Sequence, residues 1–186
     1  MARRITTKDK WKAKTWYTIV APKDFGETPV GETPASDPKM VVGRRVEVAA
    51  NDVASGKGLN HVKLIFEVEK VVGTTAHTRL VGYEVVRSYI RSIVRRRRKR
   101  IDLVKDLKIG GRKLRVKLIT MTAGKCYATQ ERDIRKVLEE SLKSPAKTVE
   151  EFMASVLSRE LQGSMKEKAK KVFPITNVEI RRIEFL

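Results

Sequence analysis

The spacing of hydrophobic residues changes near residue 86, and this change limits the folds open to the chain. In residues 61–71, Val62, Leu64 and Phe66 fall on one face of an extended chain and Lys63 and Glu67 on the other, a period of two that is typical of a strand with one buried face. In residues 86–98, hydrophobic residues recur at helical spacing instead. The chain is therefore predicted to have an α+β fold, with a mainly β region followed by an α+β region.

Four strands are expected in the first region, at residues 16–20, 43–50, 61–71 and 75–86. Their connections are short and no crossover helix separates them, which favours an antiparallel, barrel-like sheet. Between the first two strands lies a segment, residues 21–42, with prolines at 22, 29, 34 and 38. Prolines at this density are unfavourable for a helix or a central strand, so a long extended loop is expected, with docking of a partner as one use for it.

The second region is expected to begin with a helix over residues 86–98. Strands at 101–109 and 112–121 follow, joined by a turn at Gly110-Gly111. Three helices are then expected at 129–142, 149–161 and 164–172, and a strand at 178–186 closes the chain. Thr148 is the expected N-cap of the second of these helices. The predicted divisions are a basic arm (1–15), a mainly β region (16–86) and an α+β region (87–186).

Positive charge is concentrated in two segments of the chain. The formal net charge is +19, far above the roughly 2 to 8 usual for a small domain. Residues 87–130 hold fifteen basic and two acidic residues, and residues 1–23 hold seven basic and one acidic residue. Residues 24–86 are slightly acidic. A concentration of one sign of charge is what a polyanion site requires, because each neutralised phosphate releases counterions.

The candidate nucleic-acid contacts are the lysines and arginines of these two segments. The arm offers alternating lysines, the helix and its end offer arginines, and the strand after Gly111 offers a row of cations. The predicted RNA-binding residues are Lys8, Lys10, Lys12, Lys14, Arg87, Arg91, Arg95, Arg96, Arg97, Arg98, Lys99, Arg100, Arg112, Lys113, Arg115, Lys117 and Lys125. Because the arm has no apolar face to bury, it is expected to be disordered or to be ordered only by a partner.

Other classes of function find little support in the sequence. Cys126 is the only cysteine, and His61 and His77 are the only histidines, so no catalytic, metal or cofactor site is predicted. A lone cysteine fits a reducing cytoplasm. No apolar run has the length of a transmembrane helix, and no signal-peptide pattern follows the first residues. A peripheral membrane role would need apolar residues facing outward from the basic helix, whereas Ile90, Ile93 and Val94 are expected in the core.

The kind of nucleic acid is less constrained by these residues. No helix-turn-helix, zinc-finger, basic-zipper or RNA-recognition pattern is present. A basic arm, an arginine-rich helix and an irregular loop suit a folded RNA better than a regular duplex. A basic architectural protein of duplex DNA or chromatin remains the alternative.

Several blocks of the chain resemble one known family. Residues 10–25 (KWKAKTWYTIVAPKDF) and 89–102 (YIRSIVRRRRKRID) resemble the opening and the central signature of the archaeal and eukaryotic small-subunit ribosomal protein family S3Ae. The Gly-Glu-Thr-Pro segment, residues 113–116 and 134–136, and the ending from Phe173 to Arg181 fit in the same order. The chain is similar to the archaeal branch, since it lacks long lysine-rich extensions.

The resemblance implies a structural component rather than an enzyme. It would be bound to ribosomal RNA on the platform of the small subunit, beside other platform proteins and close to messenger RNA at its exit. The expected location is therefore the ribosome, in the cytoplasm. The arginine helix and cationic strand would neutralise phosphates where the RNA folds on itself, and the β region would face solvent or protein neighbours.

Overall fold

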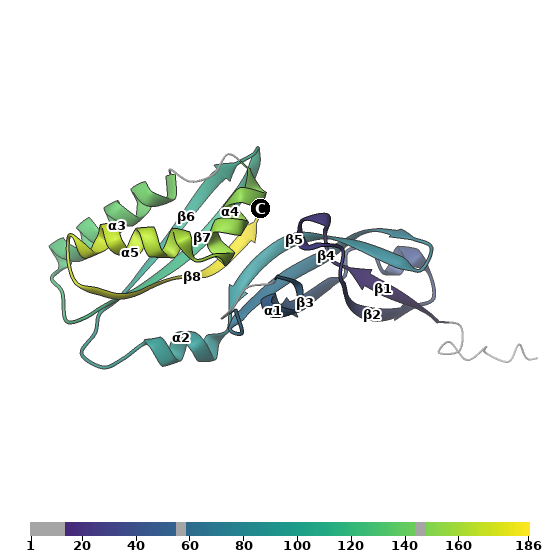
Figure 1. Ribbon diagram of the computed structural model, residues 1–186, viewed down its shortest axis with the longest axis horizontal. Helices are drawn as coiled ribbons and strands as arrows, with labels where there is room; N and C mark the ends of the chain where they lie inside the picture. The colour runs from purple at the N-terminus through teal and green to yellow at the C-terminus, as the bar shows by residue number, and fades with distance from the viewer. Residues whose placement is uncertain (1–13, 55–58, 144–147) are drawn as a thin grey trace, which may run out of the picture. The chain divides into compact units, whose positions relative to one another are not determined.

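The structure is a computed structural model that describes residues 14–54, 59–143 and 148–186 (Figure 1). The chain separates into two compact units, which interleave along the sequence. The described part of the first unit comprises residues 14–48, 52–54 and 65–81, and that of the second comprises residues 49–51, 59–64, 82–143 and 148–186. The strands β4 (Val62–Val72) and β5 (Thr75–Val85) contribute residues to both.

The first unit is built on strands. It contains β1 (Thr15–Val20), β2 (Pro29–Ala35), most of β3 (Arg45–Ala49), parts of β4 and β5, and the short helices η1 (Lys23–Phe25) and η2 (Pro38–Met40). The helix α1 (Ala50–Val53) follows β3. Tyr17 and Ile19 point from one face of β1 into a core with Val41 and Val68, all 5% exposed or less. This alternation confirms the strand expected at residues 16–20.

The sheet differs from the predicted antiparallel barrel in two ways. Within the described residues its strand order is β2-β1-β5-β8-β7-β6, with β3 and β4 beside this path, and it is not closed into a barrel. In addition, β1 runs parallel to β5, with Thr18 opposite Thr75. A parallel pair requires a long crossover connection, and the chain between β1 and β5 is long enough to supply it. The parallel pair was not predicted, because the short connections between consecutive strands favoured antiparallel pairing.

The proline-rich segment also contains a strand that was not predicted. β2 pairs antiparallel with β1, placing Trp16 opposite Pro34 and Val20 opposite Pro29, with a register shift between Ile19 and Val20. β2 lies at the edge of the sheet. An edge strand tolerates proline because a missing N–H there removes no central ladder bond. The prediction of a loop without regular structure over residues 21–42 was therefore wrong for Pro29–Ala35.

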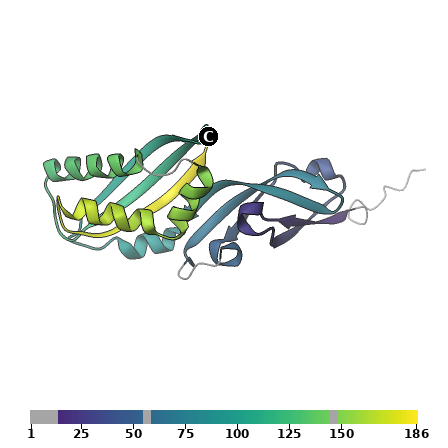
Figure 2. The same cartoon turned by 45° about the horizontal axis from the view of Figure 1, so that its top comes forward.

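The second unit packs helices on an antiparallel sheet. Its strands β6 (Arg100–Ile109), β7 (Arg112–Thr122) and β8 (Ile175–Phe185) pair in the order β8-β7-β6. The helices α3 (Ala128–Lys143), α4 (Val149–Leu157) and α5 (Glu160–Lys170) cover one face of these strands (Figure 2). Leu118 from the sheet, Leu138 from α3 and Phe152 from α4 are fully buried in this core. A mixed α+β architecture is thus confirmed.

Turns and caps follow the sequence closely in this unit. Gly110 and Gly111 have φ of 54° and 79°, as a two-residue hairpin turn requires. The Thr148 side chain accepts a hydrogen bond from the backbone N–H of Glu151, at 3.3 Å, and so caps α4. The predicted helix 149–161 is interrupted, because Arg159 has a φ of 63° and α5 begins at Glu160, earlier than expected.

Candidate nucleic-acid interface

The predicted arginine helix is shorter than expected. Helix α2 spans Arg87–Ile93, and Val94 leaves the helical conformation with ψ 112°. Arg97 has a φ of 64°, a left-handed conformation that is uncommon for a residue with a side chain. A longer helix would bring Arg95 next to Arg91 and Arg98 next to Arg95 on one face, and this like-charge repulsion favours an irregular segment over further turns. Val94, expected in the core, is 40% exposed.

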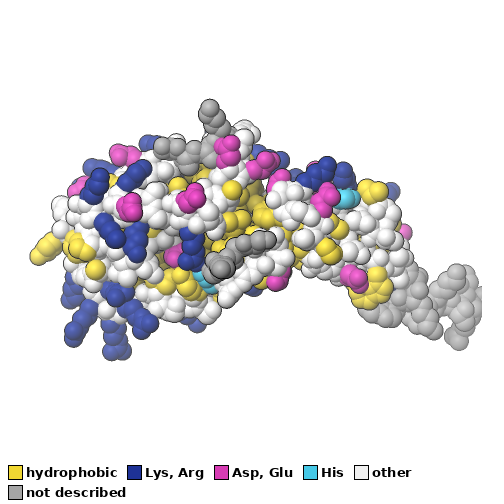
Figure 3. Space-filling view, viewed as in Figure 1, with side chains coloured by type: hydrophobic (Ala, Val, Ile, Leu, Met, Phe, Trp, Pro, Cys, Tyr) yellow, Lys and Arg dark blue, Asp and Glu magenta, His cyan; other side chains and the backbone are white. Residues whose placement is uncertain are grey.

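The arginines of this region form a dense exposed group. We call it the arginine cluster, and its members are Arg87, Arg91, Arg95, Arg96, Arg97 and Arg98. All six are exposed, and in the part of the chain that the structure describes none of their side chains has a hydrogen-bond or ion-pair partner. Figure 3 shows Lys and Arg side chains gathered on the side where Figure 1 draws α2 and the loop after it.

A polar group anchors α2 to the second unit. The ring of Tyr89 stacks on that of His61, with centroids 3.7 Å apart and planes 21° apart. The Tyr89 hydroxyl donates a hydrogen bond to Oε1 of Glu179 in β8, at 3.1 Å. A guanidinium nitrogen of Arg159 lies 2.6 Å from Nε2 of His61. These contacts fix the helix from which two arginines of the cluster project.

Burial shifts the pKa values of the groups in this anchor. Burial raises the pKa of the Glu179 carboxyl, although Arg159 and the Tyr89 hydroxyl oppose the shift. Burial also raises the pKa of Tyr89, and the neighbouring Glu179 adds to it. Burial, together with the positive charge of Arg159, lowers the pKa of His61. A neutral His61 ring accepts the hydrogen bond from Arg159, so this arrangement needs the unprotonated form.

The two cations after the cluster are paired within the chain. The Lys99 ammonium lies 2.9 Å from a carboxylate oxygen of Glu131 in α3. The backbone N–H of Lys99 donates to Oγ1 of Thr122, and the backbone N–H of Thr122 donates to the carbonyl of Lys99. Arg100 pairs with Asp102, two residues away on β6. We call the segment between α2 and β6, residues 94–99, the arginine loop. Its end is thereby attached to the end of β7 and to α3.

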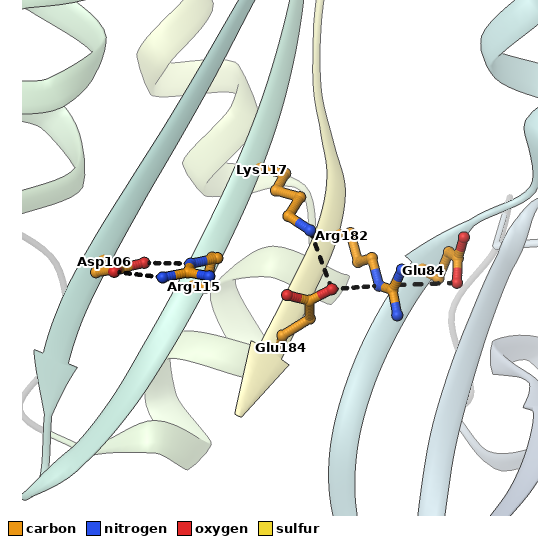
Figure 4. Close-up of polar contacts among 6 residues, drawn as sticks. All are labelled: Glu84, Asp106, Arg115, Lys117, Arg182 and Glu184. Atoms are coloured by element: carbon orange, nitrogen blue, oxygen red, sulfur yellow. Dashed lines mark hydrogen bonds and ion pairs between the residues drawn. The ribbon is translucent and has the colours of Figure 1, made fainter. Parts of the chain in front are cut away.

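The predicted cationic row on β7 lies in a ladder of alternating charges (Figure 4). Arg115 donates two hydrogen bonds to Asp106 on β6, at 2.7 and 2.9 Å. The Lys117 ammonium lies 3.0 Å from Glu184 on β8. The ladder continues from Glu184 to Arg182 at 2.9 Å, and from Arg182 to Glu84 on β5 at 3.9 Å. We call Glu84, Asp106, Arg115, Lys117, Arg182 and Glu184 the charge ladder.

The ladder leaves fewer available cations than the sequence suggested. Its acids lie on neighbouring strands, so the lysines and arginines of β7, considered alone, looked unpaired. The turn at Gly110-Gly111 contains the missing signal, since a two-residue turn there puts Asp106 opposite Arg115. The pairing holds the pKa of Asp106 below its usual range through hydrogen bonds from Arg115.

The remaining candidates are scattered around these features. Arg112 and Lys113, at the hairpin turn, are exposed, as are Lys125, in the loop before α3, and Lys14, just before β1. Lys8, Lys10 and Lys12 lie outside the described residues. Over the described ranges, no helix has the length and hydropathy to cross a membrane. Nor, in those ranges, do three or more His, Cys, Asp or Glu side chains gather as metal ligands would.

Comparison with known proteins gives the family. The model of the ribosomal S3Ae family matches residues 2–186. The chain belongs to the ribosomal S3Ae family. This confirms the resemblance seen in the sequence, and with it the expectation that the chain is a structural ribosomal protein rather than an enzyme.

Relatives with the name small ribosomal subunit protein eS1 match over nearly the whole chain. The protein of Sulfurisphaera tokodaii is 38% identical over 100% of this chain and 98% of its own length. That of Methanopyrus kandleri is 39% identical over 96% of this chain and 88% of its own. That of Desulfurococcus amylolyticus is 36% identical over 98% of this chain and 87% of its own. These S3Ae relatives are archaeal, in agreement with the expected branch.

Proposed function

We propose that this chain is a structural component of the small ribosomal subunit that binds ribosomal RNA through the arginine cluster. One observation carries the proposal: six exposed arginines on α2 and the following loop have no partner within the described residues. Guanidinium groups contact phosphates through two parallel hydrogen bonds. The relatives are named small ribosomal subunit protein eS1, and this name supports the small ribosomal subunit as the assembly.

The details of placement belong to the same proposal. The chain would be ribosome-bound in the cytoplasm, on the platform near the messenger exit, beside other platform proteins and messenger RNA. Residues 1–15 would act as an arm that orders on RNA. Residues 16–86, with two more acidic than basic residues in 24–86, would face solvent or protein neighbours. The α+β region, residues 87–186, would hold the main RNA contacts.

A salt-dependence measurement tests the arginine cluster. Replacing Arg95, Arg97 and Arg98 with alanine should weaken binding to small-subunit ribosomal RNA and flatten the log–log salt dependence by roughly one unit per lost phosphate contact. A matched control replaces Lys23, Lys39 and Lys70, which are exposed residues of the first unit, with the same change in charge. Equal slopes for the two triple variants would show that charge in general, and not this cluster, binds RNA.

Sedimentation of a cell extract tests the assembly. The protein should migrate with small ribosomal subunits at moderate salt and leave them only at high salt, because screening weakens phosphate contacts. Migration at the top of the gradient, or with DNA, would contradict the ribosomal role. Duplex DNA would then become the favoured ligand.

A further inference from the structure

One aromatic residue beside the arginine cluster is unusually exposed. The chain has four tyrosines; Tyr17 and Tyr83 are 5% and 2% exposed, and Tyr89 belongs to the anchor of α2. Tyr127 is 80% exposed. In the described part of the chain its ring stacks on no other ring and its hydroxyl has no hydrogen-bond partner. We propose that Tyr127 is a stacking surface for an unpaired RNA base.

The backbone of Tyr127 is held in place although its side chain is not. Its N–H donates to Oε1 of Gln130, at 3.0 Å, and its carbonyl accepts from the N–H of Glu131, at 3.0 Å. Both bonds belong to the first turn of α3. A tyrosine ring has few rotatable bonds, so a ring on a fixed backbone loses little entropy when a partner stacks on it.

The same segment is tied to the arginine loop at both of its ends. Thr122, before it, donates its backbone N–H to the carbonyl of Lys99 and accepts the Lys99 N–H at its side-chain Oγ1. Glu131, after it, pairs with the Lys99 ammonium. Figures 1 and 2 both draw the loop after α2 and the beginning of α3 at the same end of this unit. The segment that carries Tyr127 is thus held at both ends by Lys99, the residue that follows Arg95 to Arg98 in the chain.

The surroundings favour a nucleotide over an apolar protein partner. Lys125 is exposed two residues before Tyr127, and the segment is attached through Lys99 to the loop that contributes Arg95 to Arg98. Among the described residues between Arg87 and Tyr127, the other exposed large hydrophobic side chains are Val94 and, on β6, Val104. They are too few to form a broad apolar patch here. Cations beside one flat ring fit a phosphate and its base. Every base has a π-face, so stacking of this kind tolerates different sequences.

Stacking requires a base that is free of its duplex. Bases within an A-form helix stack on each other and offer no face to a side chain. The inference thus adds to the proposed function, on which it rests, the class of nucleotide at this point: an unpaired base from a loop, bulge or single strand.

The test compares tyrosine variants on two RNA probes, a single-stranded oligoadenosine and a blunt-ended, fully paired RNA stem of two strands without a loop. Tyr127→Ala should weaken binding of the single strand about 5-fold to 150-fold, the range measured for one stacked base. Tyr127→Phe should bind within about twofold of the wild type, since the π-face is kept. Stem binding should be unaffected. The salt slope should not change, because no phosphate contact is lost.

Trp16 provides a matched control. It is 58% exposed in β1 of the first unit, away from the arginine cluster in the sequence, and Trp16→Ala should leave both affinities unchanged. A direct signal comes from Tyr127→Trp in a Trp11→Phe, Trp16→Phe background, where base stacking should quench the fluorescence of the single tryptophan.

Two failures have different meanings. If Tyr127→Ala binds the single strand like the wild type while the Arg95, Arg97, Arg98 variant loses slope, the stacking inference is wrong and the arginine site stands. If the wild type binds neither probe and also fails to bind small-subunit ribosomal RNA, the proposed function fails and the inference falls with it. A Tyr127→Ala variant that loses association with a purified protein, and not with RNA, would also overturn the inference.

Discussion

The rings of His61 and Tyr89 stack with their centroids 3.7 Å apart, joining the residue before β4 to the arginine helix α2. The backbone repeats the connection, because the N–H of Val86 donates to the carbonyl of His61 at 2.8 Å. On its other side, Tyr89 reaches Glu179 of β8. A single tyrosine therefore fixes α2 to two separate elements of the second unit. The stability of the fold and the placement of Arg87 and Arg91 are linked through it.

Tyr89→Phe tests this link by removing only the hydroxyl. The ring stack on His61 is kept, but the Glu179 carboxyl, 9% exposed, loses its hydrogen-bond donor. Leaving a buried polar group without this partner should lower the free energy of unfolding by about 1–3 kcal/mol, measured by urea denaturation. Tyr127→Phe is the control, because that hydroxyl is exposed. Equal stability of the two variants would mean that the Tyr89 bond contributes nothing.

His61 should make stability depend on pH. Burial and Arg159 lower its pKa in the folded protein below the ordinary 6.5. As pH falls below about 6.5, the unfolded chain takes up a proton at His61 before the folded chain does. The contribution of His61 to stability therefore decreases as pH falls from about 6.5 to the folded pKa, and it decreases no further below that pKa. The groups around it are Tyr89, Arg159, Glu179 and Tyr83. In urea titrations from pH 7.5 to 5, the difference between wild type and His61→Gln should shrink as pH falls. A constant difference would contradict this.

Glu179 should act in the opposite direction. Its pKa is raised by burial above the ordinary 4.5, so its contribution is complete below about 4.5 and is lost as pH rises through the folded pKa. Glu179→Gln removes this dependence and should therefore gain stability relative to the wild type as pH rises. The same titrations that measure His61→Gln can check this, and a relative loss with rising pH would show the opposite sign of the shift.

The local pattern of the sequence predicted most elements of the second unit, because each was determined by neighbours in the chain. Gly110 and Gly111 set a turn, and with it the whole register of β6 on β7. Helix α2 ends at Ile93, and the loop after it leaves the arginines exposed to solvent. In a longer helix Arg95 would lie next to Arg91 and Arg98 next to Arg95, a like-charge repulsion that hydrophobic spacing does not take into account. The break at Arg159 is likewise tied to a partner, His61, far away in sequence.

Long-range pairing limited what could be predicted elsewhere. The parallel contact of β1 with β5 joins Thr18 to Thr75, and no local pattern indicates the direction of such a pair. Pro29 and Pro34 excluded a central strand correctly, yet they allowed an edge strand. In the candidate site, exposure of the arginine cluster followed from composition, whereas the pairing of Lys117 depended on Glu184, which lies in the last strand.

Removal of residues 1–13 should separate binding from stability. These residues contain five of the basic side chains of the first segment, Arg3, Arg4, Lys8, Lys10 and Lys12, and no apolar stripe that a core would bury. Because their sequence offers no apolar face for a core, the truncated chain should keep its melting temperature within about 2 °C, and it should bind ribosomal RNA with a smaller salt slope. A large fall in melting temperature would show that the segment packs on the fold without RNA.

The charge ladder should contribute less to RNA binding than the arginine cluster, although both were candidates in the sequence. Arg115 and Lys117 already have carboxylate partners at hydrogen-bond distance, so moving either to a phosphate gains one ion pair and breaks another. Arg115→Ala with Lys117→Ala should flatten the log–log salt dependence of RNA binding by less than one unit, whereas Arg95→Ala with Arg98→Ala should flatten it by roughly two, at one per contact. Both double variants remove two positive charges, so the comparison controls for net charge. Equal slopes would mean that RNA displaces Asp106 and Glu184 from their partners, and the sheet face would then belong to the interface.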